Sequence, residues 1–313
     1  MTRNDATESY ERLLDRCRGL EPIPTAVAHP CDEPALASAV EAGRRGLIAP
    51  ILVGPAARIE EIAKTAALDL GGTRVVDAPH SHAAAARAVA LVLEETAELL
   101  MKGSLRSDEF LSAVLSRETG LRTGRRISHV YMMDLPAYHK PLIVTDAAIN
   151  IAPSLEDKVD ICQNAIDLAI DLGIERPKVA ILGAVETVSS KMPATLDAAA
   201  LCKMADRGQI TGALLDGPLA FDSAISREAA EAKGIRSEVA GDPDILVVPD
   251  LETGNILAKL LSFLSHAHGV GLVLGARVPI MLTSRVDSVR SRIASCAVAM
   301  LVAHARRRAA GYN

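Results

Sequence analysis

Aromatic residues are scarce in this sequence, and tryptophan is absent. Three Phe and four Tyr among 313 residues make up 2% of the chain, whereas 49% of the residues are hydrophobic. The core must therefore be built mainly from Ala, Val, Leu and Ile. We expect an aliphatic core in a chain that is long enough for two domains of roughly 150 residues each.

Long apolar runs are also missing. No run reaches the 18 or so residues that a membrane-spanning helix needs. The first residues, MTRNDATESYERLL, are acidic and polar, which is unlike a signal peptide. We therefore expect a soluble, cytoplasmic protein with no membrane partner.

A basic excess is lacking, because 34 basic and 39 acidic residues give a formal charge of −5. Nucleic-acid backbones are bound mainly by clustered Lys and Arg. This balance argues against a nucleic-acid partner, but local basic sites for a small anion remain compatible with it.

Cysteine is sparse and scattered, and its spacing forms neither a CxxC nor a Cys/His pattern typical of metal sites. The five cysteines are Cys17, Cys31, Cys162, Cys202 and Cys296. We expect reduced thiols that pack as small hydrophobic side chains, and no metal ion.

Short apolar runs alternate with longer amphipathic segments along the chain. The expected strands are residues 24–29, 47–53, 74–77, 129–133, 142–145, 178–182, 212–215, 244–248, 270–274 and 278–282. The expected helices are residues 34–45, 56–67, 82–96, 108–117, 155–172, 194–206, 223–233, 255–266 and 287–308. This alternation indicates the α/β class, with mostly parallel strands joined by right-handed crossovers and covered by helices.

Two stretches suggest domain boundaries: residues 135–141, which contain two prolines, and the Gly-rich residues 268–275. If the chain crosses between domains at both, residues 140–270 form a second domain. The first domain then consists of residues 1–139 and 271–313. A cleft between two domains is a common place for a small-ligand site.

The Gly-rich stretch invites comparison with a dinucleotide-binding loop. Its spacing is GxGxxxG, it follows an expected helix, and no acidic residue lies about 20 positions further on. We therefore interpret it as a tight backbone corner that another element or a ligand approaches closely.

Polar side chains follow an apolar run in LLDGPLAFDS. Asp216 is expected at the carboxyl end of a strand, where side chains of open α/β sheets face a cleft. Asp222 or Ser223 is then expected to cap the next helix. We interpret Asp216 as a substrate-binding candidate.

The stretch VVPDLETGN repeats the order of strand, polar loop and helix. Asp250 lies in the loop, and Asn255 is expected to begin the helix. Free backbone N–H groups at a helix start bind anions readily. Asp250 and Asn255 are therefore further candidates for contact with substrate.

A hydroxyl, a guanidinium and a carboxylate occur within four residues in PIMLTSRVDS. A long helix is expected to start near Asp287, and its positive amino end lies beside Arg285, whose planar group grips phosphate through two hydrogen bonds. Ser284 can donate to an oxyanion or a sulfur. Asp287 has two interpretations, a helix cap or a general base, and Arg285 could instead form a surface ion pair.

Several stretches together resemble one known family. They are LVGP, LLMKGSLRSDEFL, HVYMM, DGPLAFDSAIS, ILVVPDLETGNILAKLL and PIMLTSRVDS, and they extend from about residue 20 to residue 303. The resemblance is to the phosphate acetyltransferase/phosphate butyryltransferase family. It implies an α/β fold of two domains with mostly parallel sheets, an isocitrate/isopropylmalate dehydrogenase-like architecture and a split first domain. We also expect a homodimer.

The resemblance implies reversible transfer of a short acyl group between CoA and orthophosphate. CoA or acyl-CoA and phosphate or acyl phosphate are then the partners, and no cofactor is needed beyond CoA as substrate. The family's Ser-Arg pair falls on Ser284, which hydrogen-bonds the CoA sulfur, and on Arg285, which binds phosphate.

The base is where the sequence departs from the acetyltransferase pattern. In those enzymes an Asp lies about seven residues after the Ser, and Arg290 or its neighbours occupy that place here. Asp287 resembles the butyryltransferase-like branch and is assigned the role of base by that resemblance. Arg106 is the candidate for a second phosphate-binding arginine.

Two hypotheses compete on this basis. One is a CoA-dependent phosphate acyltransferase, and the other is a non-catalytic relative that binds CoA or a phosphate ester. A dehydrogenase is disfavoured because neither a metal-binding Asp cluster nor a nucleotide fingerprint is evident.

Overall fold

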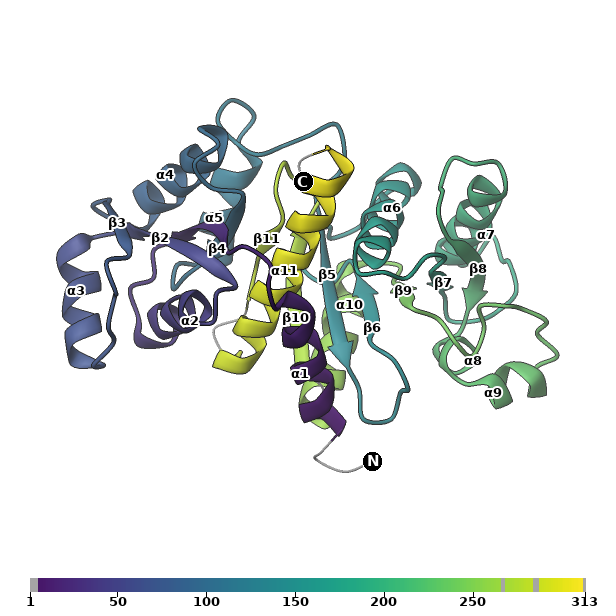
Figure 1. Ribbon diagram of the computed structural model, residues 1–313. Helices are drawn as coiled ribbons and strands as arrows, with labels where there is room; N and C mark the ends of the chain where they lie inside the picture. The colour runs from purple at the N-terminus through teal and green to yellow at the C-terminus, as the bar shows by residue number, and fades with distance from the viewer. Residues whose placement is uncertain (1–4, 266–267, 284–286, 312–313) are drawn as a thin grey trace. The chain divides into compact units, whose positions relative to one another are not determined.

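The computed structural model describes residues 5–265, 268–283 and 287–311 (Figure 1). The chain divides into two compact units. Unit 1 comprises residues 1–7 and 126–269, and unit 2 comprises residues 8–125 and 270–313. Each unit is described by itself.

Unit 2 contains a mostly parallel sheet with the strand order β3-β2-β1-β4-β11-β10. The strands are β1 (Ile23–Ala28), β2 (Ile48–Gly54), β3 (Arg74–Asp77), β4 (Leu99–Lys102), β10 (His268–Leu274) and β11 (Ile280–Met281). β4 pairs in parallel with β1 on one side and with β11 on the other, whereas β10 and β11 are antiparallel. The carboxyl ends of β1, β4 and β11 therefore lie at one edge of the sheet.

Helices cover both faces of this sheet. They are α1 (Asp5–Cys17), α2 (Glu33–Arg44), α3 (Ala56–Thr65), α4 (Ser81–Leu93), α5 (Ser107–Leu115) and α11 (Val289–Ala309). α4 packs on β1 and β2 and contacts α5, while α2 and α3 pack on the opposite face (Figure 1). α11 contacts α2 and β11.

Unit 1 contains a second sheet region, ordered β5-β6-β9-β7-β8. Its strands are β5 (Ser128–Asp134), β6 (Leu142–Thr145), β7 (Lys178–Leu182), β8 (Leu214–Leu219) and β9 (Ile245–Val247). All neighbouring pairs are parallel except the β5–β6 hairpin. Residues 135–141, expected as a crossing between domains, form the loop of that hairpin within unit 1.

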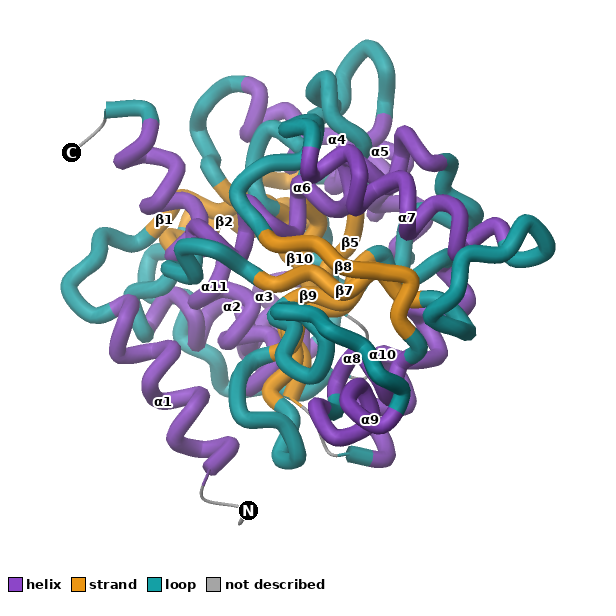
Figure 2. Tube along the Cα trace, turned by 90° about the vertical axis from the view of Figure 1, so that its right-hand side faces the viewer, coloured by secondary structure: helices purple, strands orange, loops and turns teal. Residues whose placement is uncertain are grey.

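The helices of unit 1 lie on both sides of its strands (Figure 2). They are α6 (Leu155–Asp171), α7 (Pro193–Asp206), α8 (Phe221–Ile225), α9 (Arg227–Ala232) and α10 (Leu251–Leu264). α6 and α7 lie on one side, and α8, α9 and α10 on the other (Figure 2). The α/β class and the mostly parallel pairing expected from the sequence are confirmed.

The sequence predictions missed two elements and merged two others into one. β4, with four residues, and α1 were not predicted. The helix expected over residues 223–233 is two short helices, because Ser226 ends α8 and its side chain accepts a hydrogen bond from the Ala229 N–H at the start of α9.

The core is aliphatic, as expected. Among the described residues, Phe110 is the aromatic residue in the buried hydrophobic set, beside many Ala, Val, Leu and Ile side chains. All five cysteines are free thiols. Burial raises the pKa of Cys162 and of Cys296 to about 12, so these thiols stay protonated near neutral pH and pack as hydrophobic groups. Across the described part of the chain, no helix combines the length and apolar character needed to cross a bilayer.

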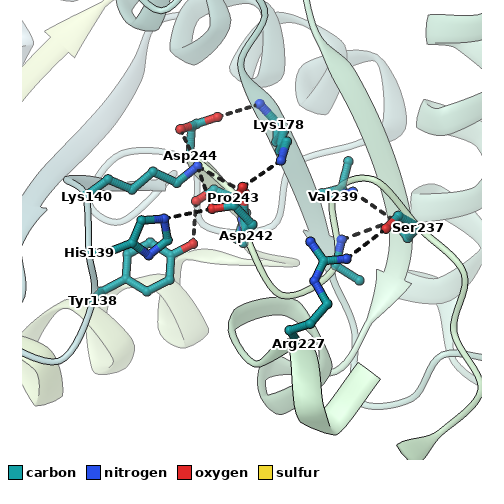
Figure 3. Close-up of polar contacts among 11 residues, drawn as sticks. Tyr138, His139, Lys140, Lys178, Arg227, Ser237, Val239, Asp242, Pro243 and Asp244 are labelled. Carbon is teal, nitrogen blue, oxygen red and sulfur yellow. Dashed lines mark hydrogen bonds and ion pairs between the residues drawn. The ribbon is translucent and has the colours of Figure 1, made fainter. Parts of the chain in front are cut away.

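An ion-pair cluster joins the amino ends of three strands in unit 1 (Figure 3). Asp242 pairs with Lys178 Nζ at 2.6 Å, His139 Nε2 at 2.9 Å and Lys140 Nζ at 3.0 Å. Asp244, which directly precedes β9, accepts from Lys140 Nζ at 2.8 Å and from the Lys178 backbone N–H at 2.8 Å. The cluster therefore links the segments that lead into β6, β7 and β9.

The lowered pKa of Asp242 shows that the surrounding cations stabilise its charged form. Partial burial acts to raise the pKa, but hydrogen bonds from Lys178 and Lys140 outweigh it and lower the pKa to about 2. An unfolded Asp titrates near pH 3.9. The cluster therefore stabilises the fold fully above about pH 5, and its contribution is lost as pH falls from there to about 2.

We expect Asp242→Asn to lower the free energy of unfolding at pH 7 by about 1–3 kcal/mol, because hydrogen bonds to charged groups are lost. Near pH 2 the difference from the original protein should shrink, since about half of the Asp242 carboxyl groups are then protonated. Urea unfolding at both pH values measures this. The control is Asp206→Asn, which removes an exposed pair with Lys203 and should cost no more than about 0.5 kcal/mol. Equal effects of the two variants would show that the cluster adds nothing.

Candidate active site

The carboxyl edge of β1, β4 and β11 in unit 2 gathers polar groups at the end of a buried sheet. His29 follows β1, Lys102 ends β4, and Thr283 lies two residues beyond β11. In open α/β sheets ligands bind outside the carboxyl ends of the strands, where consecutive crossovers run in opposite directions. The crossover from β1 leads to β2 on one side, whereas the crossover from β3 returns to β4 on the other. The switch point of unit 2 therefore lies between β1 and β4.

The β1–β4 junction is closed by a glycine. The Gly103 N–H donates to the Ala28 carbonyl oxygen at 2.8 Å, and the Ser104 N–H donates to the His29 carbonyl oxygen at 2.9 Å. A Cβ atom on Gly103 would lie 2.5 Å from each of these two oxygens. Only glycine fits there, so the backbone of β4 can run on beside β1 past the end of the strands.

His29 is a neutral imidazole at this junction. Burial first, and then the positive charge of Arg58, lower the pKa of His29 below its usual value. The Ser104 hydroxyl donates to the His29 carbonyl oxygen at 2.9 Å, and His29 Nδ1 lies 3.2 Å from the same Ser104 oxygen. We infer from this network that Nδ1 carries the proton, which leaves Nε2 as an acceptor.

Lys102 is a cation that was not among the predicted site residues, because β4 was not predicted. Its residue is 2% exposed, and its Nζ lies 3.3 Å from the Gly103 carbonyl oxygen. The sequence feature that could have revealed β4 is the short apolar run Leu99–Met101, followed by Lys-Gly. It matches a very short strand that ends at Lys102.

Two of the predicted catalytic residues, Ser284 and Arg285, lie outside the described residues. Asp287 is described, and its backbone oxygen lies 3.4 Å from Arg292 Nε. The α11 helix begins at Val289, and Ser288 is its cap, with the Ser288 hydroxyl accepting from the Ser291 N–H at 3.1 Å. The interpretation of Asp287 as the helix cap is therefore wrong, because Ser288 occupies that position.

Arg106 lies on the surface of unit 2. It is the residue before α5 and forms a two-bond ion pair with Asp108, at 3.0 and 2.9 Å, with both side chains more than two-thirds exposed. Its phosphate-binding role stays a prediction, and the contact that the structure shows for it is a surface ion pair.

Asp216 lies within β8 of unit 1, not at its end. β8, the edge strand of this sheet region, continues through Gly217 and Pro218 to Leu219, and Asp216 pairs with Ala180 of β7 in the middle of the strand. The Asp216 carboxylate accepts from the neighbouring Gly217 N–H at 2.8 Å. The expected position at a strand's carboxyl end is therefore wrong, because a proline at the strand's far end does not stop its pairing.

Asp250 and Asn255 belong to α10 of unit 1. Asp250 caps this helix by accepting from the Thr253 N–H at 2.8 Å, and the helix begins at Leu251. Asn255 was expected to begin it but lies within it, where the side-chain amide donates to the Ala147 carbonyl oxygen at 3.1 Å. Both described contacts stabilise local backbone structure.

The Asp222–Ser223 pair has a different role from the expected cap. Ala220 is the residue before α8, so Asp222 and Ser223 lie inside the helix. The Ser223 hydroxyl donates to Glu186 at 2.6 Å, and Lys233 bridges Glu186 at 2.8 Å and Asp222 at 2.9 Å. The hydrogen bond from Lys233 lowers the pKa of Glu186 and that of Asp222. This network fixes the loop after β7 to α8 and α9.

A surface cavity of about 860 Å³ in unit 2 lies at the starts of α2 and α3. Its charged lining residues are Asp32, Glu33, Arg58 and Glu61. Three carboxylates against one arginine do not suit a phosphate-bearing ligand, so we do not assign this cavity to the site. Over the described ranges, no group of three His, Cys, Asp or Glu side chains is arranged to hold a metal ion.

Comparison with known proteins identifies the family. The family model described as "Phosphate acetyl/butaryl transferase" matches residues 80–300. The chain is 63% identical to a phosphate acetyltransferase of Rhizobium meliloti, over 96% of this chain and 95% of that protein. The chain belongs to the phosphate acetyl/butyryltransferase family.

Two further relatives support the assignment of this family. A phosphate butyryltransferase of Clostridium acetobutylicum is 42% identical over 95% of this chain and 98% of that protein. The crystal structure of a branched-chain phosphotransacylase from Enterococcus faecalis covers 90% of this chain and 99% of its own, with a TM-score of 0.78 and 33% identity. The similarity to acetyl- and butyryltransferases therefore extends over nearly the whole sequence and over the fold.

Arg290, the second residue of α11, has a packing contact in unit 2. The Arg290 guanidinium carbon lies 4.4 Å from the centre of the Tyr10 ring, which is a cation–π contact. This contact joins α11 to α1 inside unit 2.

We expect Ser288→Ala to lower the free energy of unfolding by about 1 kcal/mol, because the cap of α11 is lost. Ser288→Asp should restore most of it, since Asp caps helices about as well as Ser. Thermal unfolding of the two variants measures the effect. Equal losses in the Ala and the Asp variant would contradict the capping role.

Proposed function

We infer that this protein is an acyltransferase that moves a short acyl group reversibly between CoA and orthophosphate. The observation that carries this inference is the similarity over nearly the full chain to proteins named phosphate acetyltransferase and phosphate butyryltransferase. A match over the whole length includes all the helices and strands that position the site. A match to one motif does not include them.

The reaction has a specific chemical requirement in the direction from acyl phosphate to acyl-CoA. The CoA sulfur forms a bond to the acyl carbon, the bond from that carbon to the phosphate oxygen breaks, and the thiol proton must leave. A thiol is a weak nucleophile near neutral pH until it is deprotonated. A proton acceptor and a cationic site for the leaving phosphate therefore supply most of what is needed.

The family resemblance distributes these roles over one short segment. Asp287 takes the thiol proton, Ser284 donates a hydrogen bond to the sulfur, and Arg285 holds the phosphate dianion. The start of α11 supports the assignment, because Ser288 satisfies the helix cap and Asp287 is not needed for it. The mechanism needs no covalent enzyme intermediate.

The structure supports the other predicted substrate-binding residues to different degrees. Arg106 is exposed, and its surface ion pair with Asp108 is weak. The Arg106 guanidinium can therefore exchange Asp108 for a phosphate group. Asp216, Asp250 and Asn255 are engaged in local hydrogen bonds, and we propose only that they shape the surface that CoA contacts. The homodimer and the cytoplasmic location stay predictions.

We expect acetyl-CoA and butyryl-CoA to release free thiol only when phosphate is present, without added metal or nicotinamide. The reason is that phosphate is the acyl acceptor in this direction. A thiol-reactive dye measures the rate with and without phosphate. Thiol release at the same rate without phosphate would indicate a hydrolase. CoA binding without turnover would identify the non-catalytic relative.

We expect Asp287→Asn to lower turnover by roughly 10²–10⁴, the usual scale for loss of a general base. Residual activity in the direction from acyl phosphate should recover as pH rises, because more CoA thiolate then forms unaided. The rate of acyl-CoA formation between pH 6 and 9 measures this. The control is Asp32→Asn, at the cap of α2, which keeps a capping side chain and should retain turnover. Full activity of the Asp287 variant would remove Asp287 from the mechanism.

A further inference from the structure

The Thr283 side chain is a buried hydroxyl that the fold leaves unsatisfied. Thr283 is 3% exposed, and within the described part of the chain its Oγ1 has no hydrogen-bond partner. Folded proteins pair nearly all buried polar groups, because an unsatisfied one costs free energy. A ligand or a bound water molecule can supply the missing partner of this hydroxyl.

The position of Thr283 relates it directly to Lys102. β4 and β11 pair in parallel, with Met101 opposite Met281. Lys102 follows Met101 by one residue, and Thr283 follows Met281 by two. Adjacent strands lie about 4.8 Å apart. Both side chains therefore belong to the same carboxyl edge of two neighbouring strands.

Side-chain alternation on its own would separate the two groups. Residues of adjacent parallel strands alternate between the faces of the sheet, which would direct Lys102 to one face and Thr283 to the other. The Lys102 Nζ, however, lies 3.3 Å from the carbonyl oxygen of Gly103, the first residue beyond β4. The ammonium has thus folded forward past the strand end, toward the edge to which Thr283 belongs.

The edge lies beside the switch point between β1 and β4, where α2 and α4 pack on opposite faces of the sheet (Figure 1). Gly103 carries no side chain there and has no room for one. A ligand that enters at this edge meets a buried positive charge and a hydroxyl donor, with the neutral His29 on the neighbouring strand.

We propose that Lys102 and Thr283 bind the phosphate of the acyl-transfer reaction, as orthophosphate or as the phosphoryl group of the acyl phosphate. The Lys102 ammonium gives a charge-assisted hydrogen bond to one phosphate oxygen, and the Thr283 hydroxyl donates to another. Both donors stabilise the negative charge that grows on the phosphate as its bond to the acyl carbon breaks. The inference rests on the proposed function and adds two phosphate-binding residues to it.

Phosphate binding can be measured apart from catalysis. A ligand that binds only the folded state raises the melting temperature with its concentration. We expect inorganic phosphate alone to raise the melting temperature of the protein, and Lys102→Met and Thr283→Val to lose most of that rise. Thr283→Val in phosphate-free buffer should be no less stable than the original protein, because it removes an unsatisfied hydroxyl.

Steady-state kinetics separate phosphate from the phosphate groups of CoA. We expect the KM for phosphate to rise at least tenfold in Thr283→Val and kcat/KM for phosphate to fall on the order of 10²-fold in Lys102→Met. The KM for acyl-CoA should stay within about twofold, as expected when a contact serves only the other substrate. Thr283→Ser keeps the hydroxyl and should retain most of the phosphate dependence, and Lys102→Arg serves if the Met variant does not fold.

Matched controls come from unit 1. Thr145→Val removes a buried hydroxyl that donates to the His129 carbonyl oxygen at 2.9 Å, and Lys158→Met removes a buried cation paired with Asp197 at 2.6 Å. Both should lose stability, while the rise in melting temperature with phosphate and the KM for phosphate stay unchanged.

Two results would overturn the proposal while leaving the proposed function intact. One is a normal KM for phosphate in Thr283→Val and Lys102→Met, and the other is a rise confined to the KM for acyl-CoA. If the unaltered protein itself fails to release thiol with phosphate, the proposed function fails instead. The phosphate-induced rise in melting temperature would then still test the site.

Discussion

The parallel pairing of β4 with β1 on one side and β11 on the other is the constraint on which the candidate site depends. It brings segments near residues 28, 102 and 281 to one edge, although they are far apart in the sequence. The pairing with β1 extends one step beyond the strands because Gly103 leaves no side chain between the two backbones. Without it, Lys102 would not lie beside the segment that leads from β11 to Thr283.

The sequence predicted the elements whose pattern is local and missed those that depend on distant partners. The bounds of β3, β6 and β7 were predicted as observed, because each contains consecutive aliphatic residues with β-branched members. β4 has four buried residues, as β6 does, but its Leu, Met and Lys side chains favour a helix as readily as a strand, whereas β6 contains β-branched residues. β4 is a strand because β1 and β11 supply its hydrogen bonds, and no local pattern contains that information.

The site could be predicted from the sequence only where residues with different roles also have different sequence contexts. Asp250 and Asp287 both precede a helix, but only the former caps it, since Ser288 takes that role at α11. The position of Asp216 was mispredicted for the same reason. The sequence alone does not distinguish a strand that continues through Asp-Gly-Pro from a strand that ends there. Family resemblance assigned the chemistry correctly to an acyltransferase, whereas the role of each carboxylate depends on contacts that only a fold defines.

Two sheet edges in the molecule differ in how their polar groups are paired. At the amino edge in unit 1, Asp242 lies within ion-pair distance of His139, Lys140 and Lys178. The two lysines lower its pKa to about 2 against the effect of partial burial, although Oδ1 accepts no well-aligned hydrogen bond from the described residues. Such a cluster stabilises the fold and offers a ligand little. At the carboxyl edge in unit 2, Thr283 keeps an unsatisfied donor in a buried place. In the proposed site this donor is left for the anion to complete, and binding of the anion offsets the cost of the unsatisfied hydroxyl.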